Sequence, residues 1–203
     1  MSLKSFPHYQ QQEAADCGPS CLRMIAKYYG KVYSAEMLRK RCFISREGVS
    51  LLGISDAAES IGLRTIGVQI SFKQLAEDAS FPCILHWNQN HFVVCYGIEK
   101  RKRKGEFEYR IHISDPATQR VNLTRKEFEK CWFSSRNSQD ETGVALMLEP
   151  SPNFGSVEDE FHTTKKSLFS FAKYLLPFKS LGLQLIFGLI AGCIIQLILP
   201  FLS

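Results

Sequence analysis

The hydrophobic pattern of this chain changes at Phe81-Pro82, and this change restricts the fold more than any other feature of the sequence. Before it, apolar residues mostly recur at the spacing of amphipathic helices, with Ser34 and Ser50 at positions that N-caps favour. After it, β-branched and aromatic residues form short runs separated by turn residues. Helices followed by an antiparallel sheet predict an α+β domain.

Capping signals place several of the predicted elements. Ser71 with Gln74, and Thr124 with Glu127, have the spacing of capping boxes. The basic run at residues 100–104 is predicted to form a solvated turn with Gly105. The predicted helices cover residues 18–29, 35–41, 51–61 and 72–77 and a stretch with Phe128 and Trp132; the predicted strands cover 64–70, 83–87, 91–98, 107–113, 119–123 and 143–148. The buried stripe predicted after Ser50 consists of Leu51, Leu52, Ile54, Ala58 and Ile61.

The composition divides the chain into four parts. Residues 1–149 are predicted to form the α+β domain, and residues 150–166, with prolines, a glycine and an acidic run, a linker. Residues 167–180 are amphipathic and aromatic, which favours a helix at a membrane surface. Residues 181–203 carry no charge over the roughly 20 residues that a bilayer-spanning helix needs. They predict a first transmembrane helix and hence the lipid bilayer as a partner.

The lysines that precede this span place the domain on the cytoplasmic side by the positive-inside rule. The alternative is a C-terminal helix that packs on the soluble domain.

Several classes of site are not expected. The chain has seven cysteines, an odd number without a Cys-x-x-Cys pair, which argues against a disulfide framework and a zinc site. The net charge of +5 is mild, and the basic run alone does not make a nucleic-acid surface. No Gly-x-x-x-x-Gly-Lys-Ser/Thr phosphate loop occurs, so ATP is not expected to bind these residues. The sequence therefore predicts no metal, no cofactor and no nucleic acid.

Cys17 is predicted to lie at the N-terminus of the first helix. Asp16 is a preferred N-cap residue, Pro19 suits the first turn, and Gly30 suits the C-terminal end. The positive end of the helix and its free N–H groups stabilise a thiolate. This position favours a nucleophilic cysteine, although a cysteine at a helix start is more often structural.

A cysteine nucleophile needs a base and a group that orients the base. His91 begins a predicted strand next to a polar turn, and Asp115 follows the strand at 107–113. The order Cys17, His91, Asp115 matches that of papain-like enzymes. A histidine on a strand is also common as a core residue, so this reading stays open on the residues alone. The histidines are His8, His86, His91, His112 and His162.

Three ordered motifs make the assignment more specific. The first is Gln11 followed by Asp16-Cys17-Gly18 and Tyr28-Tyr29-Gly30, the second runs from His91 to Gly97, and the third is Asp115-Pro116. Together they resemble the bacteriocin-processing cysteine peptidases, the N-terminal domains of peptidase-containing ABC transporters. The resemblance covers about residues 5 to 149 and implies a papain-like fold, with N-terminal helices packed on an antiparallel sheet.

The resemblance implies a role for each matching residue. Cys17 is then the nucleophile, His91 the general base and acid, and Asp115 the group that holds the imidazole. Gln11 is implied to donate a side-chain N–H to the oxyanion hole, together with the backbone N–H of Cys17. Cys21 is expected to be a small buried hydrophobic residue.

The implied substrate is a precursor peptide with a double-glycine-type leader, cut on the cytoplasmic side of a bacterial inner or plasma membrane. Export through an ABC transporter is implied as well, with ATP bound only by a nucleotide-binding domain that these residues lack. A full-length transporter of this kind is expected to be a homodimer. The alternatives are a catalytically silent cargo-docking domain and a papain-like cysteine acyltransferase or amidase. We favour a piece of a longer exporter over a naturally short, membrane-tethered peptidase.

Overall fold

The computed structural model describes residues 5–45, 48–103, 106–133, 141–157, 184 and 187–196. The chain divides into two compact units, Met1–His162 and Thr163–Ser203. Of the second unit, the described residues 184 and 187–196 are helical. None of the helices in the described ranges is both long enough and apolar enough to cross a membrane. The predicted interfacial helix at 167–180 and most of the predicted span at 181–203 lie outside the described residues and stay predictions.

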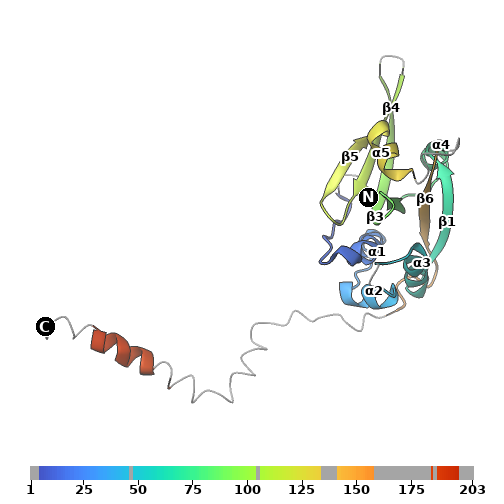
Figure 1. Ribbon diagram of the computed structural model, residues 1–203. Coiled ribbons are helices and arrows are strands. Elements are labelled where there is room, and N and C mark those ends of the chain that lie inside the picture. The colour runs from blue at the N-terminus through green and yellow to red at the C-terminus, as the bar shows by residue number, and fades with distance from the viewer. Residues whose placement is uncertain are drawn as a thin grey trace. The chain divides into compact units, whose positions relative to one another are not determined.

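The first unit contains helices and strands in nearly the predicted order (Figure 1). The helices are the 3-10 helix η2 (Ala14–Asp16) and α1 (Cys17–Tyr28), α2 (Ala35–Arg41), α3 (Leu51–Ser60), α4 (Phe72–Glu77) and α5 (Arg125–Trp132). The strands are β1 (Leu63–Ser71), β2 (Cys83–Trp87), β3 (His91–Arg103), β4 (Glu106–Ser114), β5 (Arg120–Thr124) and β6 (Thr142–Pro150).

The strands form one sheet of six, in the order β1-β6-β2-β3-β4-β5, and every neighbouring pair is antiparallel. Alternate residues of the central strands enter two different cores, as the pleat requires. Phe92 and Val94 of β3 pack with α1, α2 and α3, whereas Val93 and Cys95 pack with α4 and α5. The helices therefore cover both faces of the sheet, and the predicted α+β class with an antiparallel sheet is confirmed.

The caps expected from the sequence set the helix boundaries. Ser34 and Ser50 accept hydrogen bonds from the backbone N–H groups of Met37 and Gly53. Ser71 and Thr124 each form a complete capping box. These local signals explain why the predicted and observed starts of α2, α3, α4 and α5 agree.

Two details of the prediction are wrong. Leu52, predicted to be buried, is 69% exposed, because it lies in the first turn of α3 on the side away from the core residue Ile54. Residues 100–103 of the basic run do not form a turn: they continue β3 and pair with residues 106–109 of β4. A strand edge accommodates lysine and arginine as well as a turn does, so charge alone did not distinguish them.

Residues 151–157, which composition assigned to a linker, pack on the first unit. The backbone N–H of Ser151 donates to the carbonyl of Gly62 at 3.0 Å. The ring of Phe154 contacts that of Tyr29 edge-on, with centroids 6.1 Å apart. The packed part of the chain thus reaches residue 157.

Candidate active site

Cys17 is the first residue of α1, immediately after η2. The buried face of α1 fixes its position, because Leu22 and Ile25 are fully buried against the sheet. The thiol of Cys21, one turn along, donates to the carbonyl of Phe92 at 3.3 Å. This contact holds the start of α1 beside the start of β3, where His91 lies. Cys21 is fully buried, as expected for a packing residue, and burial raises the pKa of its thiol well above the ordinary value.

Gly18 allows a close approach next to Cys17. A Cβ atom at this position would lie 2.6 Å from Cγ1 of Val49 and 2.7 Å from Cδ1 of Ile54. Any other residue would therefore push α1 away from the segment that leads into α3. The glycine after the cysteine lets this segment form one wall beside the thiol.

His91 and Asp115 are joined by a short hydrogen bond. His91 is the first residue of β3, and Asp115 follows the last residue of β4, its antiparallel neighbour. Nε2 of His91 lies 2.7 Å from Oδ1 of Asp115. Asp115 also accepts from the backbone N–H of Ala117 at 2.9 Å and from the hydroxyl of Thr118 at 3.1 Å. These bonds fix the carboxylate, which in turn fixes the imidazole and leaves Nδ1 for Cys17.

The surroundings of His91 favour its charged form. Burial opposes the imidazolium, but hydrogen bonds with Asp115 and Cys17, and the negative charge of both groups, outweigh it and raise the pKa of His91 from 6.5 to about 9. Burial likewise opposes the Asp115 carboxylate, yet the hydrogen bonds from His91, Ala117 and Thr118 hold its pKa below the ordinary value. The geometry therefore supports an imidazolium paired with a carboxylate at neutral pH.

Asp115→Asn should lower the pKa of His91. Without the carboxylate, burial is opposed only by Cys17, so we expect His91 to titrate at least about one pH unit lower than in the wild type. Histidine NMR resonances followed between pH 5 and 10 measure this value; an unchanged titration would contradict the assignment of Asp115.

The raised pKa of His91 in the wild type also affects the stability of the fold. Because the pKa of His91 is raised from 6.5 to about 9 on folding, its charge stabilises the fold fully below pH 6.5. This contribution is lost as the pH rises through 9. The free energy of unfolding of the wild type should therefore fall more steeply than that of Asp115→Asn between pH 7 and 9.

Gln11 lies between the Asp115 loop and the turn before Cys17. Its backbone N–H donates to the carbonyl of Pro116 at 2.9 Å. Its side-chain Nε2 donates weakly to the carbonyl of Ala14 at 3.4 Å, and its Oε1 is buried without a hydrogen-bond partner in the described part of the chain. A carboxamide held this loosely can exchange its partner for a ligand oxygen.

Asp16 is the N-cap residue of α1, as predicted, but its side chain makes no cap hydrogen bond. It is the last residue of η2, and its carboxylate accepts from the backbone N–H of Glu13 at 3.1 Å. Arg39 of α2 lies 3.0 Å from Oδ1 of Asp16 through Nε and 2.9 Å from Oε2 of Glu13 through Nη2. The carboxylate of Asp16 is instead directed to the backbone of Glu13 and to α2. Arg39 thus ties α2 to the turn that carries Cys17.

Arg39→Ala should destabilise the domain. The Asp16 side chain is only 6% exposed, so removal of the guanidinium leaves a buried carboxylate without its ion pair. We expect a loss of about 2 to 3 kcal/mol in the free energy of unfolding, since Arg39 itself is partly exposed. Urea unfolding measures this loss, with Arg41→Ala on the same helix as the control. Equal stabilities of the two variants would contradict the role of Arg39.

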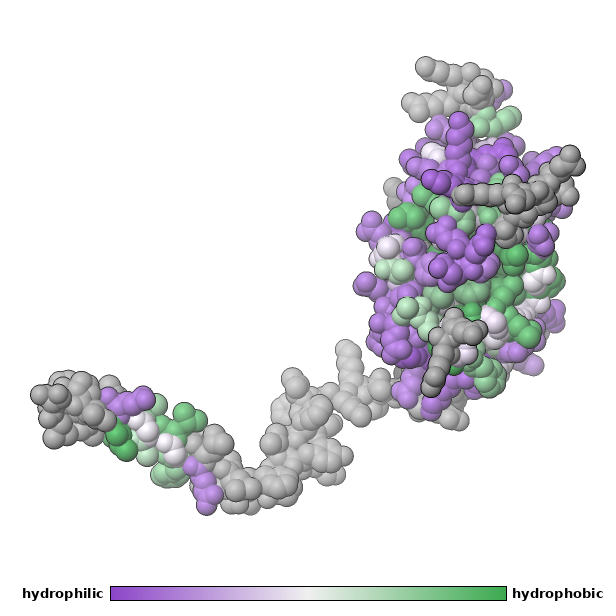
Figure 2. All heavy atoms as spheres, viewed as in Figure 1, coloured by the Kyte–Doolittle hydropathy of each residue, from purple (hydrophilic) through white to green (hydrophobic). Residues whose placement is uncertain are grey.

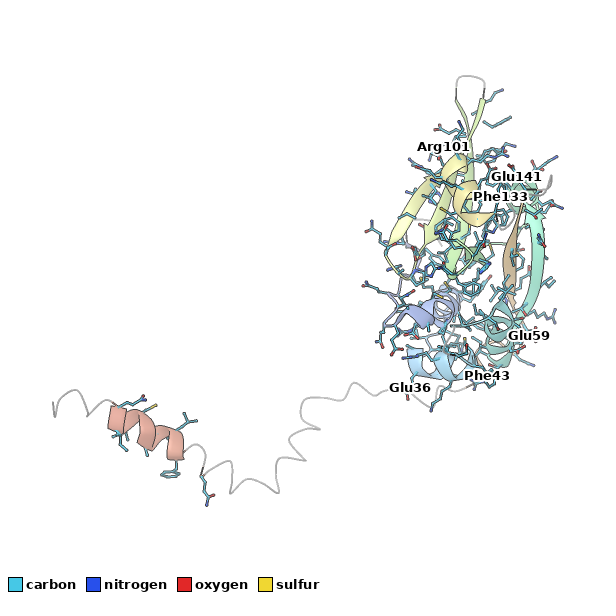
Figure 3. All side chains as sticks on the ribbon, viewed as in Figure 1. Glu36, Phe43, Glu59, Arg101, Phe133 and Glu141 are labelled. Carbon is cyan, nitrogen blue, oxygen red and sulfur yellow. The ribbon has the colours of Figure 1, made fainter. Side chains whose placement is uncertain are left out.

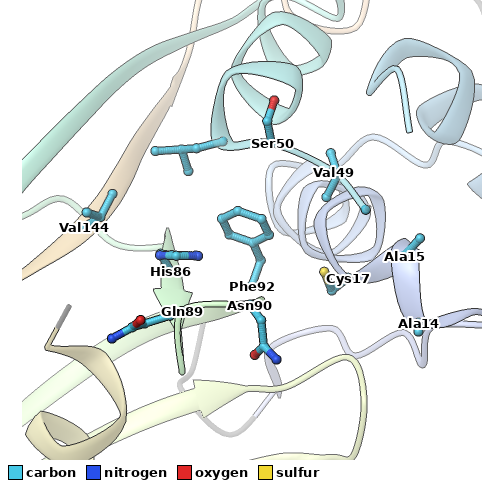
Figure 4. A pocket seen from close by; sticks show the side chains of 12 residues that line it. Ala14, Ala15, Cys17, Val49, Ser50, His86, Gln89, Asn90, Phe92 and Val144 are labelled. Carbon is cyan, nitrogen blue, oxygen red and sulfur yellow. The ribbon is translucent and has the colours of Figure 1, made fainter. Parts of the chain in front are cut away.

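A cleft of about 650 Å³ opens beside Cys17 (Figure 4). Its walls come from the turn before α1, from residues 48–51 before and in α3, and from the β2–β3 hairpin. Figure 4 shows the thiol of Cys17 between the ring of Phe92 and the Ala14–Ala15 turn. A peptide backbone entering this cleft would reach the thiol.

The structure thus brings together Cys17, His91 and Asp115, and it brings Gln11 to the turn before the nucleophile. Arg39 was not predicted from the sequence, because no local pattern signals a contact between a helix and a distant turn. Gln89 and Asn90, in the polar turn before His91, also line the cleft, although no role was predicted for them. Within the described ranges, no group of His, Cys, Asp and Glu side chains is arranged to hold a metal ion.

Comparison with known proteins identifies the family. Residues 5–152 match the family model of the peptidase C39 family. The chain belongs to this family. The C39 domain therefore includes the whole sheet and every candidate site residue, and the family is one of cysteine peptidases.

Similar proteins share this domain. The chain is 31% identical over 164 residues to the colicin V secretion/processing ATP-binding protein CvaB of Escherichia coli, covering 81% of this chain and 21% of that protein. It is 27% identical over 199 residues to the transport/processing ATP-binding protein ComA of Streptococcus pneumoniae, covering 94% and 25%. The chain thus spans about a fifth to a quarter of the length of these relatives.

A solved structure of the same fold is the double glycine motif protease from an AMS/PCAT transporter in complex with the leader peptide. It has a TM-score of 0.60 and 34% identity, and the match covers 71% of this chain and 91% of that chain.

Proposed function

We propose that this C39 domain is a cysteine endopeptidase that cleaves the leader from double-glycine-type precursor peptides, with Cys17, His91 and Asp115 as its catalytic triad. The observation that carries the proposal is the placement of His91, hydrogen-bonded to Asp115 at 2.7 Å and to the thiol of Cys17. The substrate class is supported by the similar protease whose structure contains a leader peptide.

The geometry suggests the reaction steps. The Cys17 thiolate attacks the carbonyl carbon of the second small residue, which ends the leader, and the carbonyl oxygen becomes an oxyanion. The backbone N–H of Cys17 and Nε2–H of Gln11 donate to this oxyanion. His91 gives its proton to the leaving amine, so that the peptide bond breaks and an acyl-enzyme remains. His91 then takes a proton from water, which attacks the thioester and releases the leader with a free carboxylate.

Gln11 needs one rearrangement for this role. Its Nε2 must leave the carbonyl of Ala14, a bond already long at 3.4 Å. Weak apo hydrogen bonds that tighten with substrate are common at catalytic sites.

Cleavage of synthetic peptides tests the proposal. The full chain in mild detergent is incubated with a leader that ends in Gly-Gly followed by cargo residues, and the products are identified by mass. We expect one cut, after the second glycine, and none when both glycines are replaced by valine. Absence of any cut would favour a silent cargo-docking domain. Transfer of the leader to added hydroxylamine, with no hydrolysis in its absence, would favour an acyltransferase.

We also propose that the domain works as part of an ABC-type exporter at the cytoplasmic side of a bacterial inner or plasma membrane, as a homodimer. The names of its relatives as secretion/processing and transport/processing ATP-binding proteins support this context. In such a protein the lipid bilayer is a partner, and ATP binds outside the residues present here. Protease protection of the domain in inverted and right-side-out vesicles would test the orientation.

A further inference from the structure

An N-terminal arm, residues 6–12, runs without helix or strand beside α1 and leads into the turn before Cys17 (Figure 1). Its first anchor is the ring of Phe6, which belongs to the core around α1. The ring stacks on that of Tyr96 of β3, with centroids 4.6 Å apart, and lies 5.5 Å from that of Tyr28 of α1. In Figure 2 hydrophilic side chains cover much of the surface of the first unit, whereas Phe6 is only 4% exposed. The start of the arm is therefore fixed to the fold.

A second anchor joins the backbone of the arm to β5. Nη1 of Arg120, the first residue of β5, donates to the carbonyl of Phe6 at 3.1 Å. In the pairing of β4 with β5, Arg120 stands opposite Ser114, the last residue of β4. The arm is thus held next to the point where β4 ends, immediately before Asp115.

His8 makes the third anchor, between α1 and β4, where Figure 3 shows closely packed side chains. Nδ1 of His8 lies 3.0 Å from Oγ of Ser114, which is fully buried. The hydroxyl of Ser114 donates to Sδ of Met24 at 3.1 Å, so it accepts from Nδ1–H of His8. Burial and the Arg120 guanidinium lower the pKa of His8 below 6.5, although Asp115 opposes this shift. The ring is therefore mostly neutral at pH 7, and its one proton serves the bond to Ser114.

The arm reaches the candidate active site at Gln11, whose backbone N–H donates to the carbonyl of Pro116 at 2.9 Å. Two residues of the arm are thus bonded to the residues on either side of Asp115: His8 to Ser114, and Gln11 to Pro116. The side chain of Gln11, in contrast, is held only by its long bond of 3.4 Å. The position of this carboxamide therefore depends on how firmly the backbone of the arm is anchored.

We propose that His8 is a positioning residue of the peptidase, which holds the arm so that Nε2–H of Gln11 meets the oxyanion. This inference rests on the proposed function. His8 acts through Gln11 rather than through Asp115, because the Asp115 carboxylate is fixed by three hydrogen bonds of its own. A misplacement of about 1 Å can slow a reaction about a hundredfold. Binding of the leader should not change, since His8 does not line the cleft beside Cys17.

The test compares His8→Leu with His8→Asn in the full chain. Leucine removes the donor at similar size, whereas asparagine places an amide N–H near the position of Nδ1. We expect His8→Leu to lower kcat for a double-glycine leader peptide about tenfold or more and to change KM by less than about twofold. His8→Asn should recover most of kcat. Ser80→Ala is the matched control, because it removes a hydrogen bond of similar length, 3.1 Å to Glu149, and should leave both constants unchanged.

A double-mutant cycle shows whether His8 acts through Gln11. In the Gln11→Ala background, His8→Leu should have no further effect on kcat, because the group that His8 positions is already absent. The proposal is overturned if the two effects add, if His8→Leu changes KM rather than kcat, or if His8→Asn is as slow as His8→Leu. A lower free energy of unfolding in His8→Leu, with kcat equal to that of the wild type, would mean that His8 serves stability alone.

Failure of the proposed function is recognised separately. A wild type that cleaves no leader peptide would refute the peptidase activity, whereas hydrogen exchange at the backbone N–H of Gln11 still tests the arm. We expect this exchange to be about fivefold faster in His8→Leu, as loss of one hydrogen bond predicts, with the titration of His91 unchanged. Equal exchange in His8→Leu and the wild type would show that His8 does not hold the arm. A lowered pKa of His91 in His8→Leu would show that His8 acts through Asp115 instead.

Discussion

Cys17→Ala is expected to cleave double-glycine leader peptides at least about 10⁴-fold more slowly than the wild type. The substitution removes the atom that attacks the carbonyl, and of the cysteines in the described part of the chain only Cys17 lines the cleft. Single-turnover cleavage followed by mass measures the effect. Because Cys17 is a small buried residue, alanine leaves the fold intact, and circular dichroism should show an unchanged spectrum.

Cys131→Ala is the matched control for this prediction. Cys131 lies on α5, at the opposite face of the sheet from α1, and is partly exposed. Its loss should change the rate by less than about twofold. Equal activity of Cys17→Ala and Cys131→Ala would disprove the peptidase assignment.

His91→Ala is expected to reduce the rate by a similar factor, because the proton of the leaving amine then has no donor. Loss of a triad member generally leaves only the contribution of binding and of the oxyanion hole. The pH–rate profile gives a second readout: the fall in rate above about pH 9 that His91 imposes in the wild type should disappear from the residual activity. This expectation follows from the raised pKa of His91, which is about 9.

The variant His86→Ala distinguishes the role of His86 from that of His91, the two histidines near the cleft. His86 also lines it, and its ring contacts that of Phe92 with centroids 5.3 Å apart. Burial lowers the pKa of His86, so the ring is mostly neutral at pH 7, and no carboxylate of the described residues pairs with it. We expect His86→Ala to change KM more than kcat. A complete loss of activity in His86→Ala, with activity retained in His91→Ala, would mean that the base was assigned to the wrong residue.

Local signals made most of the fold predictable. α4 begins and ends as predicted, at Phe72 and Glu77, because a capping box depends only on residues three apart. The positions of the central strands were predictable because short runs of β-branched and aromatic residues are also a local signal. Leu52 was misplaced because the hydrophobic pattern identified the helix correctly but could not distinguish its flank from its buried face.

The geometry of the site was less accessible to sequence. Cys17 and His91 are 74 positions apart in the sequence, and they come together because α1 packs against β3. The family resemblance predicted that Cys17 and His91 act together, whereas the residues alone left this assignment open. The contact of Arg39 with Asp16 depends on how α2 packs against the turn, which no local pattern encodes. The catalytic roles of Cys17, His91 and Asp115 remain predictions that the variants above test, and the role of Gln11 in the oxyanion hole remains a prediction.

The packing of Phe154 on Tyr29 holds the segment of residues 151–157 at the C-terminal end of α1. Tyr29 follows the last residue of α1, whereas Cys17 is the first. A helix of 12 residues is about 18 Å long, so the contact of Phe154 and the thiol lie at opposite ends of α1. None of residues 151–157 lines the cleft beside Cys17. A peptide can therefore enter this cleft without displacing the segment that packs at the C-terminal end of α1.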